Sequence, residues 1–464
     1  MTPVAIVGGG VTGLTAAFYL QRLNIPFTLY EASGRVGGLI QTTCRDGFLV
    51  EHGPNTILES VPEVAALVKD LELTARCLYP AAEMKARYVV RNGKTQRVPQ
   101  SAVAAARTPL LSVKAKLRIM AEPFISRTAL VDEALSEFVV RRLGVEVLDY
   151  LIDPFVGGVY AGDPGRLSVE HAFPKLHKLE QTYGSLIKGS LVGARARKKR
   201  ERAEGTVSKT SARMLSFEGG LSVLVDRLRA KLGNAVELGT AVKAMRPNGW
   251  GWTLELATGH IREGTIREHS AVLLCAPAHR VAQMKILGVA AAEMESLRTV
   301  YYPPIARVAV AFPRDKIAHA LDGFGVLIPK REQMNTLGIL FSSSLFPRRA
   351  PEGYALLTAY VGGSRGPDVV NMTDAELLEL TVADIEKLLG VAGRPVFEDV
   401  VRVPLSIPQY NVGYGTVKES IGKIEARAKG LFLAGSYRGG ISVADCIAGG
   451  KAASDKVREY AGTT

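Results

Sequence analysis

The order of hydrophobic and polar positions near the N-terminus predicts a strand, a tight turn, a helix and a second strand. A β-branched run at residues 4–7 predicts a short buried strand, and residues 14–20 are a helix-favouring stretch that follows a glycine-rich turn. Residues 27–30 predict the second strand. The apolar run has no basic residue before it and no small-residue cleavage site after it, which argues against a secretory signal.

The downstream pattern predicts a helical region followed by a sheet. Residues 61–73 predict an amphipathic helix, and residues 87–99 predict a hairpin with Asn92-Gly93 at its turn. Helical periodicity dominates residues 101–151. Strands with turns between them, several antiparallel in character, are then predicted at 235–247, 250–259, 270–278, 306–313, 324–329, 336–344 and 354–363. A helix over 374–389 and a buried strand over 431–434 follow.

The first turn has the spacing G-x-G-x-x-G, formed by Gly8, Gly10 and Gly13. Between a strand and a helix, this spacing allows a tight turn, close approach of the backbone to a pyrophosphate, and packing of the helix on the strand. The N–H groups and the dipole of the helix N-terminus favour the anion. Glu31 lies 18 residues beyond Gly13, where an acid is expected to bind a ribose hydroxyl. The sequence therefore predicts a dinucleotide-binding domain, with a turn that only packs as the alternative.

Further glycines indicate a cofactor longer than a nicotinamide dinucleotide. Residues 35–38 contribute an arginine and two glycines, and a second turn lies at 53–56. Such an extension suits FAD. Near the C-terminus, Gly435 ends a strand and Ser442 is the expected N-cap of a helix whose dipole would point at a flavin ring. A helix that merely docks the domain is the alternative. The FAD contacts predicted from these segments are Gly8, Gly9, Gly10, Val11, Thr12, Gly13, Glu31, Ala32, Arg35, Gly37, Gly38, Gly53, Pro54, Asn55, Thr56, Gly435, Ile441, Ser442 and Val443.

Length and charge restrict the class of protein. A chain of 464 residues needs two or more domains, and we predict no transmembrane helix. The net charge of +13 indicates an anionic partner, which leaves nucleic acid, acidic lipid and a carboxylate substrate open. The basic segment 195–205 has no interleaved aromatic residues, so we expect a solvated loop and no nucleic-acid binding. The 4 cysteines are far apart, which argues against a disulfide framework or a zinc site and fits a reducing cytoplasm.

The helical region carries an apolar face flanked by basic side chains. Leu110, Val113, Leu117 and Met120 follow one face, and residues 114–118 contain three basic side chains beside it. Such a helix suits an anionic membrane surface. A surface helix packed on its own protein has the same pattern, so both interpretations stay open.

Five longer segments are more specific: DPFVGGVYAGDPGRLSVEHAFPKLHKLE, GFGVLIP, LGILFSSSLFPRRAPEG, VGGSR and GISVADCIAGG. With them the chain resembles, over nearly its whole length, the FAD-dependent amine oxidase and desaturase superfamily, and within it the oxygen-dependent protoporphyrinogen oxidases of haem biosynthesis. The resemblance implies non-covalent FAD and the oxidation of protoporphyrinogen IX to protoporphyrin IX. It implies three hydride transfers to flavin N5, each followed by reoxidation with dioxygen to hydrogen peroxide. Because the cofactor carries this chemistry, no catalytic side chain and no metal site is expected.

The resemblance also implies a substrate pocket formed by Arg97, Gly158, Leu327, Leu340 and Tyr360. The arginine would pair with a propionate, because a guanidinium suits a planar carboxylate. The two leucines would enclose a pyrrole ring, and the tyrosine would stack where relatives often carry a phenylalanine. The glycine would let the backbone approach the macrocycle. On the cofactor side, Val242 matches a strand residue whose backbone meets the adenine.

The expected fold class is α/β, with a Rossmann-like FAD-binding domain, an α+β substrate domain with a mixed sheet, and a helical membrane-binding insertion. We expect the FAD-binding domain at 1–85, 219–277 and 418–464, the substrate domain at 86–92, 196–218 and 278–417, and the membrane-binding domain at 93–195. The expected partners are a porphyrinogen, dioxygen, a peripheral membrane surface in the cytoplasm and a second copy of the chain.

Other functions stay open at this point. A coproporphyrinogen III oxidase differs in the number of carboxylates on its substrate. A flavin amine oxidase usually has an aromatic cage, but the turn GSYRGGISVAD supplies one tyrosine and no cysteine for covalent flavin. A carotenoid desaturase is disfavoured by Arg97. A dinucleotide-binding protein without catalysis, whose basic linker recruits an acidic partner, is the alternative outside enzymes.

Overall fold

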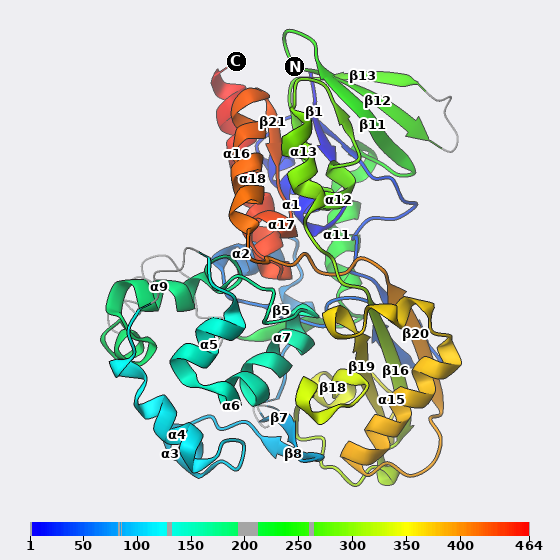
Figure 1. Cartoon of the computed structure of the whole chain (residues 1–464). Coiled ribbons are helices and arrows are strands. Elements are labelled where there is room, and N and C mark those ends of the chain that lie inside the picture. The colour runs from blue at the N-terminus through cyan, green and yellow to red at the C-terminus, as the bar shows by residue number, and fades with distance from the viewer. Residues whose placement is uncertain are drawn as a thin grey trace.

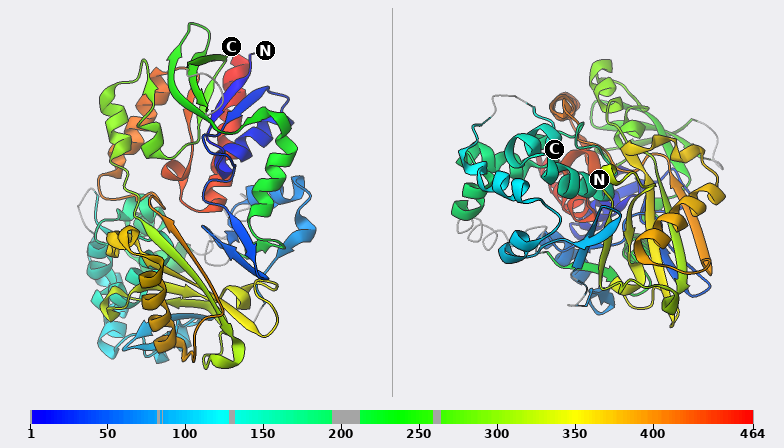
Figure 2. Two further views of the ribbon diagram at one scale, coloured as in Figure 1. Left: turned by 90° about the vertical axis from the view of Figure 1, so that its right-hand side faces the viewer. Right: turned by 60° about the horizontal axis from the view of Figure 1, so that its bottom comes forward.

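The computed structural model describes residues 2–81, 84, 86–127, 132–193, 212–258 and 264–463. They form two connected parts (Figure 1). The upper part in that view holds both ends of the chain, and the lower part combines a group of helices on one side with a large sheet on the other (Figures 1 and 2). The basic segment 195–205 lies outside the described residues.

A parallel sheet of five strands forms the centre of the upper part, in the order β10-β2-β1-β14-β21. Its strands are β1 (Val4–Val7), β2 (Phe27–Tyr30), β10 (Val236–Glu237), β14 (Val272–Leu274) and β21 (Leu431–Leu433). One face packs against α1 (Val11–Arg22), α11 (Ser222–Leu232) and α18 (Val443–Thr463). Strands from the two ends of the chain therefore belong to one sheet. The predicted strands at 4–7 and 27–30 are confirmed, and the predicted helix at 14–20 begins earlier and ends later.

The other face of this sheet is covered by helices and by a second sheet. The helices are α12 (Ala278–Val281), α13 (Ala291–Arg298) and α16 (Tyr414–Arg427). The second sheet has the order β13-β12-β11-β15 and consists of β11 (Thr240–Pro247), β12 (Trp252–Thr258), β13 (Thr265–His269) and β15 (Lys285–Ile286). The strand predicted over 235–247 is thus two strands in two sheets, because the chain turns at Gly239, where φ is +63°.

A sheet of seven strands forms the lower part, in the order β20-β16-β19-β18-β17-β7-β8. Its strands are β7 (Ala86–Arg91), β8 (Lys94–Arg97), β16 (Ile305–Pro313), β17 (Gly323–Leu327), β18 (Thr336–Leu340), β19 (Tyr354–Gly362) and β20 (Phe397–Val403). Only β17 and β7 pair in parallel, so the sheet is mixed, as predicted. Helix α15 (Asp374–Leu389) covers one face and begins and ends where the sequence predicted. The hairpin of β3 (Thr42–Arg45) and β4 (Phe48–Glu51) packs on the other face.

Short elements connect these sheets. Residues predicted as a helix over 61–73 form α2 (Pro62–Asp70). The others are β5 (Ile57–Leu58), β6 (Cys77–Leu78), β9 (Met214–Phe217), α14 (Ser342–Leu345) and α17 (Ser436–Gly439). Because α14 follows β18 directly, the strand predicted over 336–344 stops at Leu340.

The helical region is a set of short helices rather than one long one. Ser101 and Ser112 cap new helices by accepting hydrogen bonds from the backbone N–H of Ala104 (3.2 Å) and Ala115 (3.1 Å), and Gly144 ends another at φ +94°. The helices are α3 (Ala102–Arg107), α4 (Val113–Met120), α5 (Leu135–Leu143), α6 (Val145–Val147), α7 (Asp153–Tyr160), α8 (Val169–Ala172), α9 (Pro174–Tyr183) and a helical segment at 186–193, with a π-turn over Leu148–Ile152.

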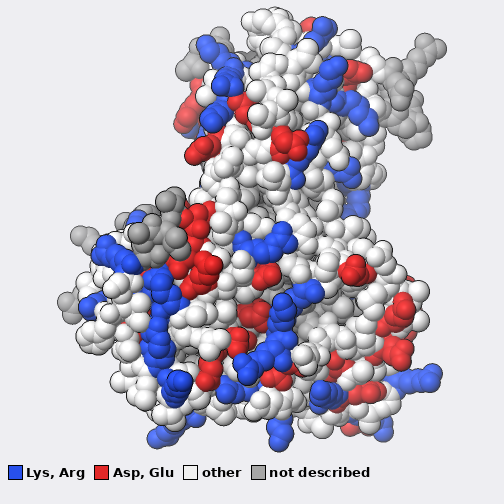
Figure 3. Space-filling model, in the orientation of Figure 1, with Lys and Arg blue, Asp and Glu red and all other residues white. Residues whose placement is uncertain are grey.

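The apolar face of α4 is exposed. Val113, Leu117 and Met120 are 72%, 60% and 71% exposed, and Phe124 just beyond them is 88% exposed, whereas Leu110 is buried. The face is therefore not packed on its own protein. Figure 3 shows a column of Lys and Arg side chains on this side of the molecule, between α9 and α4. Among the described helices, none is both long enough and apolar enough to span a bilayer.

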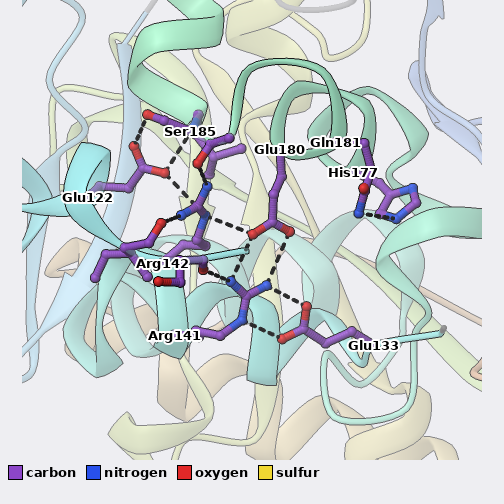
Figure 4. Close-up of polar contacts among 12 residues, drawn as sticks. Glu122, Glu133, Arg141, Arg142, His177, Glu180, Gln181 and Ser185 are labelled. Atoms are coloured by element: carbon purple, nitrogen blue, oxygen red, sulfur yellow. Dashed lines mark hydrogen bonds and ion pairs between the residues drawn. The ribbon is translucent and has the colours of Figure 1, made fainter. Parts of the chain in front are cut away.

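Buried ion pairs hold these helices together (Figure 4). Arg142 is fully buried between Glu122 and Glu180, with its Nε 3.2 Å from a carboxylate oxygen of each. Arg141 bridges Glu180 and Glu133 at 2.8 and 2.7 Å. The charges in this cluster are thus paired with one another, as buried charges must be.

Candidate active site

The turn between β1 and α1 has the geometry of a phosphate cradle. Gly8 has φ +111°, which favours glycine, and a Cβ on Gly13 would overlap the carbonyl oxygen of Gly8. A Cβ on Gly10, by contrast, would meet nothing within 4 Å, so open space lies at the N-terminus of α1. Two glycines are therefore required by the packing of the turn, and the third faces a space that a pyrophosphate fits.

Glu31 follows β2 and lies against this turn. Its Oε2 accepts a hydrogen bond from the backbone N–H of Gly9 at 2.6 Å, and its Oε1 accepts one from the N–H of Ser33 at 2.8 Å. The next predicted residue, Ala32, follows directly in the chain. A carboxylate held beside the glycine turn fits the ribose-binding role.

The second glycine segment is tied to the first. The N–H of Gly37 donates to the carbonyl of Gly9 at 2.8 Å. The Arg35 guanidinium binds its own loop, donating to the carbonyl of Gly38 at 2.7 Å. Gly53 also needs to be glycine, since its Cβ would overlap the carbonyl of Leu39. Residues 35–38 and 53–56 thus continue the cradle away from α1, as a cofactor longer than a single nucleotide requires.

The C-terminal segment meets the N-terminal one. Ser442 Oγ accepts a hydrogen bond from the N–H of Asp445 at 3.1 Å, and Asp445 Oδ2 accepts one from the N–H of Ser442 at 3.2 Å, so α18 has a reciprocal cap. Gly435 has φ +139°. Helices α18 and α1 lie side by side (Figure 1), and a Cβ on Gly450 would be 2.5 Å from the Thr12 carbonyl oxygen.

The remaining predicted cofactor residues adjoin these groups. Val11 and Thr12 begin α1, Pro54 and Thr56 flank Asn55, and Ile441 and Val443 flank Ser442. Val242 lies on β11, 6% exposed, in the cluster that includes Tyr30 at the end of β2. The structure thus brings residues from five separate stretches of the chain to one region.

Three of the predicted substrate residues share one face of the seven-stranded sheet. Gly338 on β18 pairs with Leu327 on β17 and with Tyr360 on β19. Leu340 lies two residues beyond Gly338, and side chains alternate along a strand, so it faces the same way. Gly158 on α7 also belongs here, because a Cβ on it would overlap the Leu327 side chain. The structure brings these four predicted residues together.

Arg97 lies on the opposite face. It pairs with Tyr88, which pairs with Val326, the neighbour of Leu327 in the chain. Its Nε donates to the Tyr88 hydroxyl at 3.0 Å, and its guanidinium forms an ion pair with Asp322. Arg97 also lines an open cavity of about 730 Å³ between β8 and α3. Its pairing with a substrate propionate stays a prediction, and the structure does not bring it to the two leucines.

Two other arginines of the hairpin do lie on the face of Leu327. Alternation along β7 sets Arg87, Val89 and Arg91 on that face, since Val89 pairs with Leu327. Arg91 is 3.2 Å from Glu146. Arg87 is exposed, and the described part of the chain offers its guanidinium no partner. Sequence reasoning missed Arg87, because the face is set by the register between β7 and β17, which the sequence does not contain.

Asn55 and Tyr360 connect the cofactor segment to the substrate face. The Asn55 amide donates a hydrogen bond to the Tyr360 hydroxyl. Burial raises the pKa of Tyr360 to about 12, although the nearby Arg307 charge lowers it. The phenol is therefore neutral at physiological pH. Among the described residues, no group of His, Cys, Asp and Glu is arranged to hold a metal ion.

Glycine-rich segments from both ends of the chain form one extended cradle, and an apolar face of the seven-stranded sheet lies beside it. This arrangement defines an FAD-dependent oxidoreductase. The chain belongs to the family of flavin-containing amine oxidoreductases, whose family model matches residues 11–458.

Individual relatives are similar over their full length. Protoporphyrinogen oxidase 2 of Arabidopsis thaliana is 36% identical, over 98% of this chain and 94% of that protein. Coproporphyrinogen III oxidase of Bacillus subtilis is 31% identical, over 98% of both. The solved structure of a candidate protoporphyrinogen oxidase from Exiguobacterium sp. 255-15 has a TM-score of 0.80 at 25% identity and covers 99% of both chains. UDP-galactopyranose mutase, with a TM-score of 0.75 at 16% identity, over 99% of this chain and 94% of that one, shares the fold.

Proposed function

We propose that this protein oxidises protoporphyrinogen IX to protoporphyrin IX. Three molecules of dioxygen accept the six electrons and six protons and become three molecules of hydrogen peroxide. When bound, FAD supplies the hydride acceptor and its reoxidation by dioxygen. The Arabidopsis and Bacillus relatives named above are a protoporphyrinogen oxidase and a coproporphyrinogen III oxidase, and the apolar surface formed by Leu327, Leu340 and Gly158 suits a flat tetrapyrrole.

The observation that favours a substrate with few carboxylates is the pairing of the arginines on and around this face. Arg307, Arg349 and Arg365 are each within 2.5–2.8 Å of an acidic partner, respectively Asp399, Glu51 and Asp153. Arg87 on this face, by contrast, has no partner among the described residues. A site with one available guanidinium fits protoporphyrinogen, which has two propionates, better than coproporphyrinogen, which has four.

The chain's own residues would bind and orient the substrate. In this proposal Arg87 on β7 holds a propionate, and Leu327 and Leu340 contact a pyrrole ring. Tyr360 stacks on the ring system, and Gly158 lets the backbone of α7 approach it. The apolar side chains exclude water from the reacting carbon atoms.

An anaerobic titration tests the proposal. Purified protein loaded with FAD is mixed under nitrogen with protoporphyrinogen IX or coproporphyrinogen III, and the flavin absorption and the product fluorescence are followed. We expect flavin bleaching and product formation with the dicarboxylate. Turnover with the tetracarboxylate alone would instead identify a coproporphyrinogen III oxidase, and bleaching by amines alone would identify an amine oxidase. No flavin change with any of them contradicts an oxidase.

We also propose that the enzyme acts in the cytoplasm at a membrane surface, that it forms a homodimer, and that the three domains divide as expected from the sequence.

The exposed apolar face of α4 and the basic side chains around it support membrane attachment. Leu117→Glu and Phe124→Glu should each reduce sedimentation with vesicles rich in phosphatidylglycerol. Ile266→Glu, on a residue 59% exposed in the far part of the molecule, is the matched control. Equal sedimentation of all three variants contradicts attachment through α4.

A further inference from the structure

The hydroxyl of Tyr360 accepts a hydrogen bond from a residue of the predicted cofactor segment. Tyr360 lies on β19 in the substrate face, whereas Asn55 belongs to the 53–56 segment assigned to the cofactor. Their contact spans 305 positions of sequence. It is therefore a direct connection between the two halves of the proposed active site.

The orientation of the Asn55 amide fixes the direction of this hydrogen bond. Its Nδ2 also points at the carbonyl of Gly53 at 3.4 Å, so the nitrogen side of the amide faces two acceptors. The Tyr360 oxygen is thus the acceptor in the contact. A phenol has one proton of its own, and the described residues offer no acceptor for it.

Two other buried tyrosines, Tyr88 and Tyr410, donate that proton to a neighbouring group. The Tyr88 hydroxyl donates to Asp322 Oδ1 at 2.5 Å, and the Tyr410 hydroxyl donates to the Ser436 carbonyl at 2.5 Å. A donor left without an acceptor in a partly buried site is costly unless something else accepts from it. Tyr360 is only partly buried, so its side chain is accessible to a ligand.

We propose that Tyr360 is a ligand-orienting residue whose hydroxyl, held by Asn55, donates a hydrogen bond to an oxygen acceptor of the bound ligands. The acceptor is a carbonyl of the isoalloxazine or a propionate of the tetrapyrrole. For the propionate as acceptor, this inference rests on the proposed function. For the isoalloxazine carbonyl it does not. It assigns the hydroxyl, which a stacking phenylalanine lacks, a role separate from that of the ring.

The test uses the Tyr360→Phe variant as FAD-loaded holoenzyme, and two measurements separate the two acceptors. The first is the absorption spectrum and the reduction potential of the flavin without substrate. The second is the KM and kcat for protoporphyrinogen IX, together with the affinity for the product protoporphyrin. Tyr354→Phe, on the same strand and 41% exposed, is the matched control.

If the acceptor is the flavin, Tyr360→Phe shifts the spectrum and the potential. If it is a propionate, Tyr360→Phe raises KM and weakens product binding by about 10-fold or more, because a hydrogen bond to a charged group is lost. Tyr354→Phe leaves all of these unchanged. Asn55→Ala should produce a smaller change in the same direction, and it should add little to Tyr360→Phe.

The inference is overturned if Tyr360→Phe matches wild type in both measurements while wild type oxidises the porphyrinogen. If wild type does not oxidise porphyrinogens but Tyr360→Phe still shifts the flavin spectrum, the proposed function fails and the role of the hydroxyl stands. Should Tyr360→Phe not fold, Asn55→Ala is measured alone, and the absence of any shift in either measurement overturns the inference.

Discussion

Gly10 and Gly13 differ in what surrounds their Cα atoms, although both belong to one motif. A side chain on Gly13 would collide with the backbone of Gly8, whereas a side chain on Gly10 would enter open space. Gly10 also has an ordinary backbone conformation, with φ −69° and ψ 172°. Gly13 is therefore needed for the fold and Gly10 for the ligand.

Alanine substitutions should separate these two needs. We expect Gly13→Ala to lower the free energy of unfolding by about 1–3 kcal/mol and to abolish FAD binding. Gly10→Ala should leave the melting temperature of the cofactor-free protein unchanged and weaken FAD binding by about 10-fold or more. Gly449→Ala, on α18 with open space around it, is the control. Equal loss of stability in both variants would contradict this division.

Arg87 and Arg97 belong to one hairpin but lie on opposite faces of the sheet. We expect Arg87→Gln to raise the KM for protoporphyrinogen by about 10-fold or more, with a smaller effect on kcat, because a charged hydrogen bond to a carboxylate is lost. Arg97→Gln should change KM less, since that side chain is engaged with Asp322 and Tyr88. Steady-state kinetics of both variants decides, and the reverse order would restore Arg97 as the propionate partner.

Local geometry could be predicted where the motif is local. The glycine turn, Glu31 and the Ser442 cap depend on neighbours within a few residues or on one strand, and the structure has them as expected. The face of Arg97 depends on register, and the partner of Tyr360 is far away in sequence. Neither is encoded in local periodicity.

Among the elements, three helical segments of the 101–193 region are joined by buried charges. Glu122 binds the N-terminus of the helical segment at 186–193, accepting from Ser185 Oγ at 2.6 Å and from the N–H of Leu186 at 2.9 Å. Arg142 joins it to α5 and α9 (Figure 4). The exposed apolar face of α4 thus rests on a fully buried ion cluster.

Removing the central cation should destabilise this group of helices strongly. We expect Arg142→Met to cost about 3–5 kcal/mol, because the buried Glu122 loses its cationic partner and the buried Glu180 keeps only Arg141. Arg298→Met breaks an exposed pair with Glu295 and should cost less than about 1 kcal/mol. Urea unfolding measures both. Adding Glu122→Gln and Glu180→Gln to Arg142→Met should recover part of the loss, and no recovery would argue against an electrostatic cause.

Acid should weaken the same cluster. Burial by itself raises the pKa of Glu122, but the hydrogen bonds from Ser185, Leu186 and Ile187 and the Arg142 charge outweigh it and leave the pKa below 4.5. Its stabilising contribution is therefore complete above the pKa of the unfolded chain and is lost as pH falls through the lower folded value. We expect Glu122→Gln to be less stable than wild type at pH 7, with the difference shrinking below about pH 4. A difference independent of pH would contradict this.

The elements themselves were predicted unevenly, for physical reasons. Strong periodicity identified α15 and the hairpin of β7 and β8, and the turn at Asn92-Gly93 has positive φ at both residues, as that pair favours. The helical stretch at 101–151 was predicted without its breaks, although Ser101, Ser112 and Gly144 mark them. Strand β20 was missed, because its sequence FEDVVRV carries charges that only pairing with β16 accommodates.

On the scale of the whole molecule, the two ends of the chain complete one domain. Strands β1 and β21 flank β14 in the parallel sheet, and α18 packs on α1. FAD that contacts both ends should therefore stabilise them as a unit, by about 2.7 kcal/mol at a free concentration of 100 times its Kd.

Hydrogen exchange can check this coupling. We expect added FAD to slow exchange in peptides from α1 and from α18 by the same factor, while peptides from α4, on the far side of the molecule, change little. Protection of α1 without α18 would show that the C-terminal helix does not take part in cofactor binding.

The pairing of β21 with β14 also has a consequence for biosynthesis. Translation delivers β21 and α18 only after every strand of the substrate face has been made. A chain released earlier consequently lacks the C-terminal part of the expected FAD site. Chains released before β21 and α18 are made should therefore stay colourless and inactive.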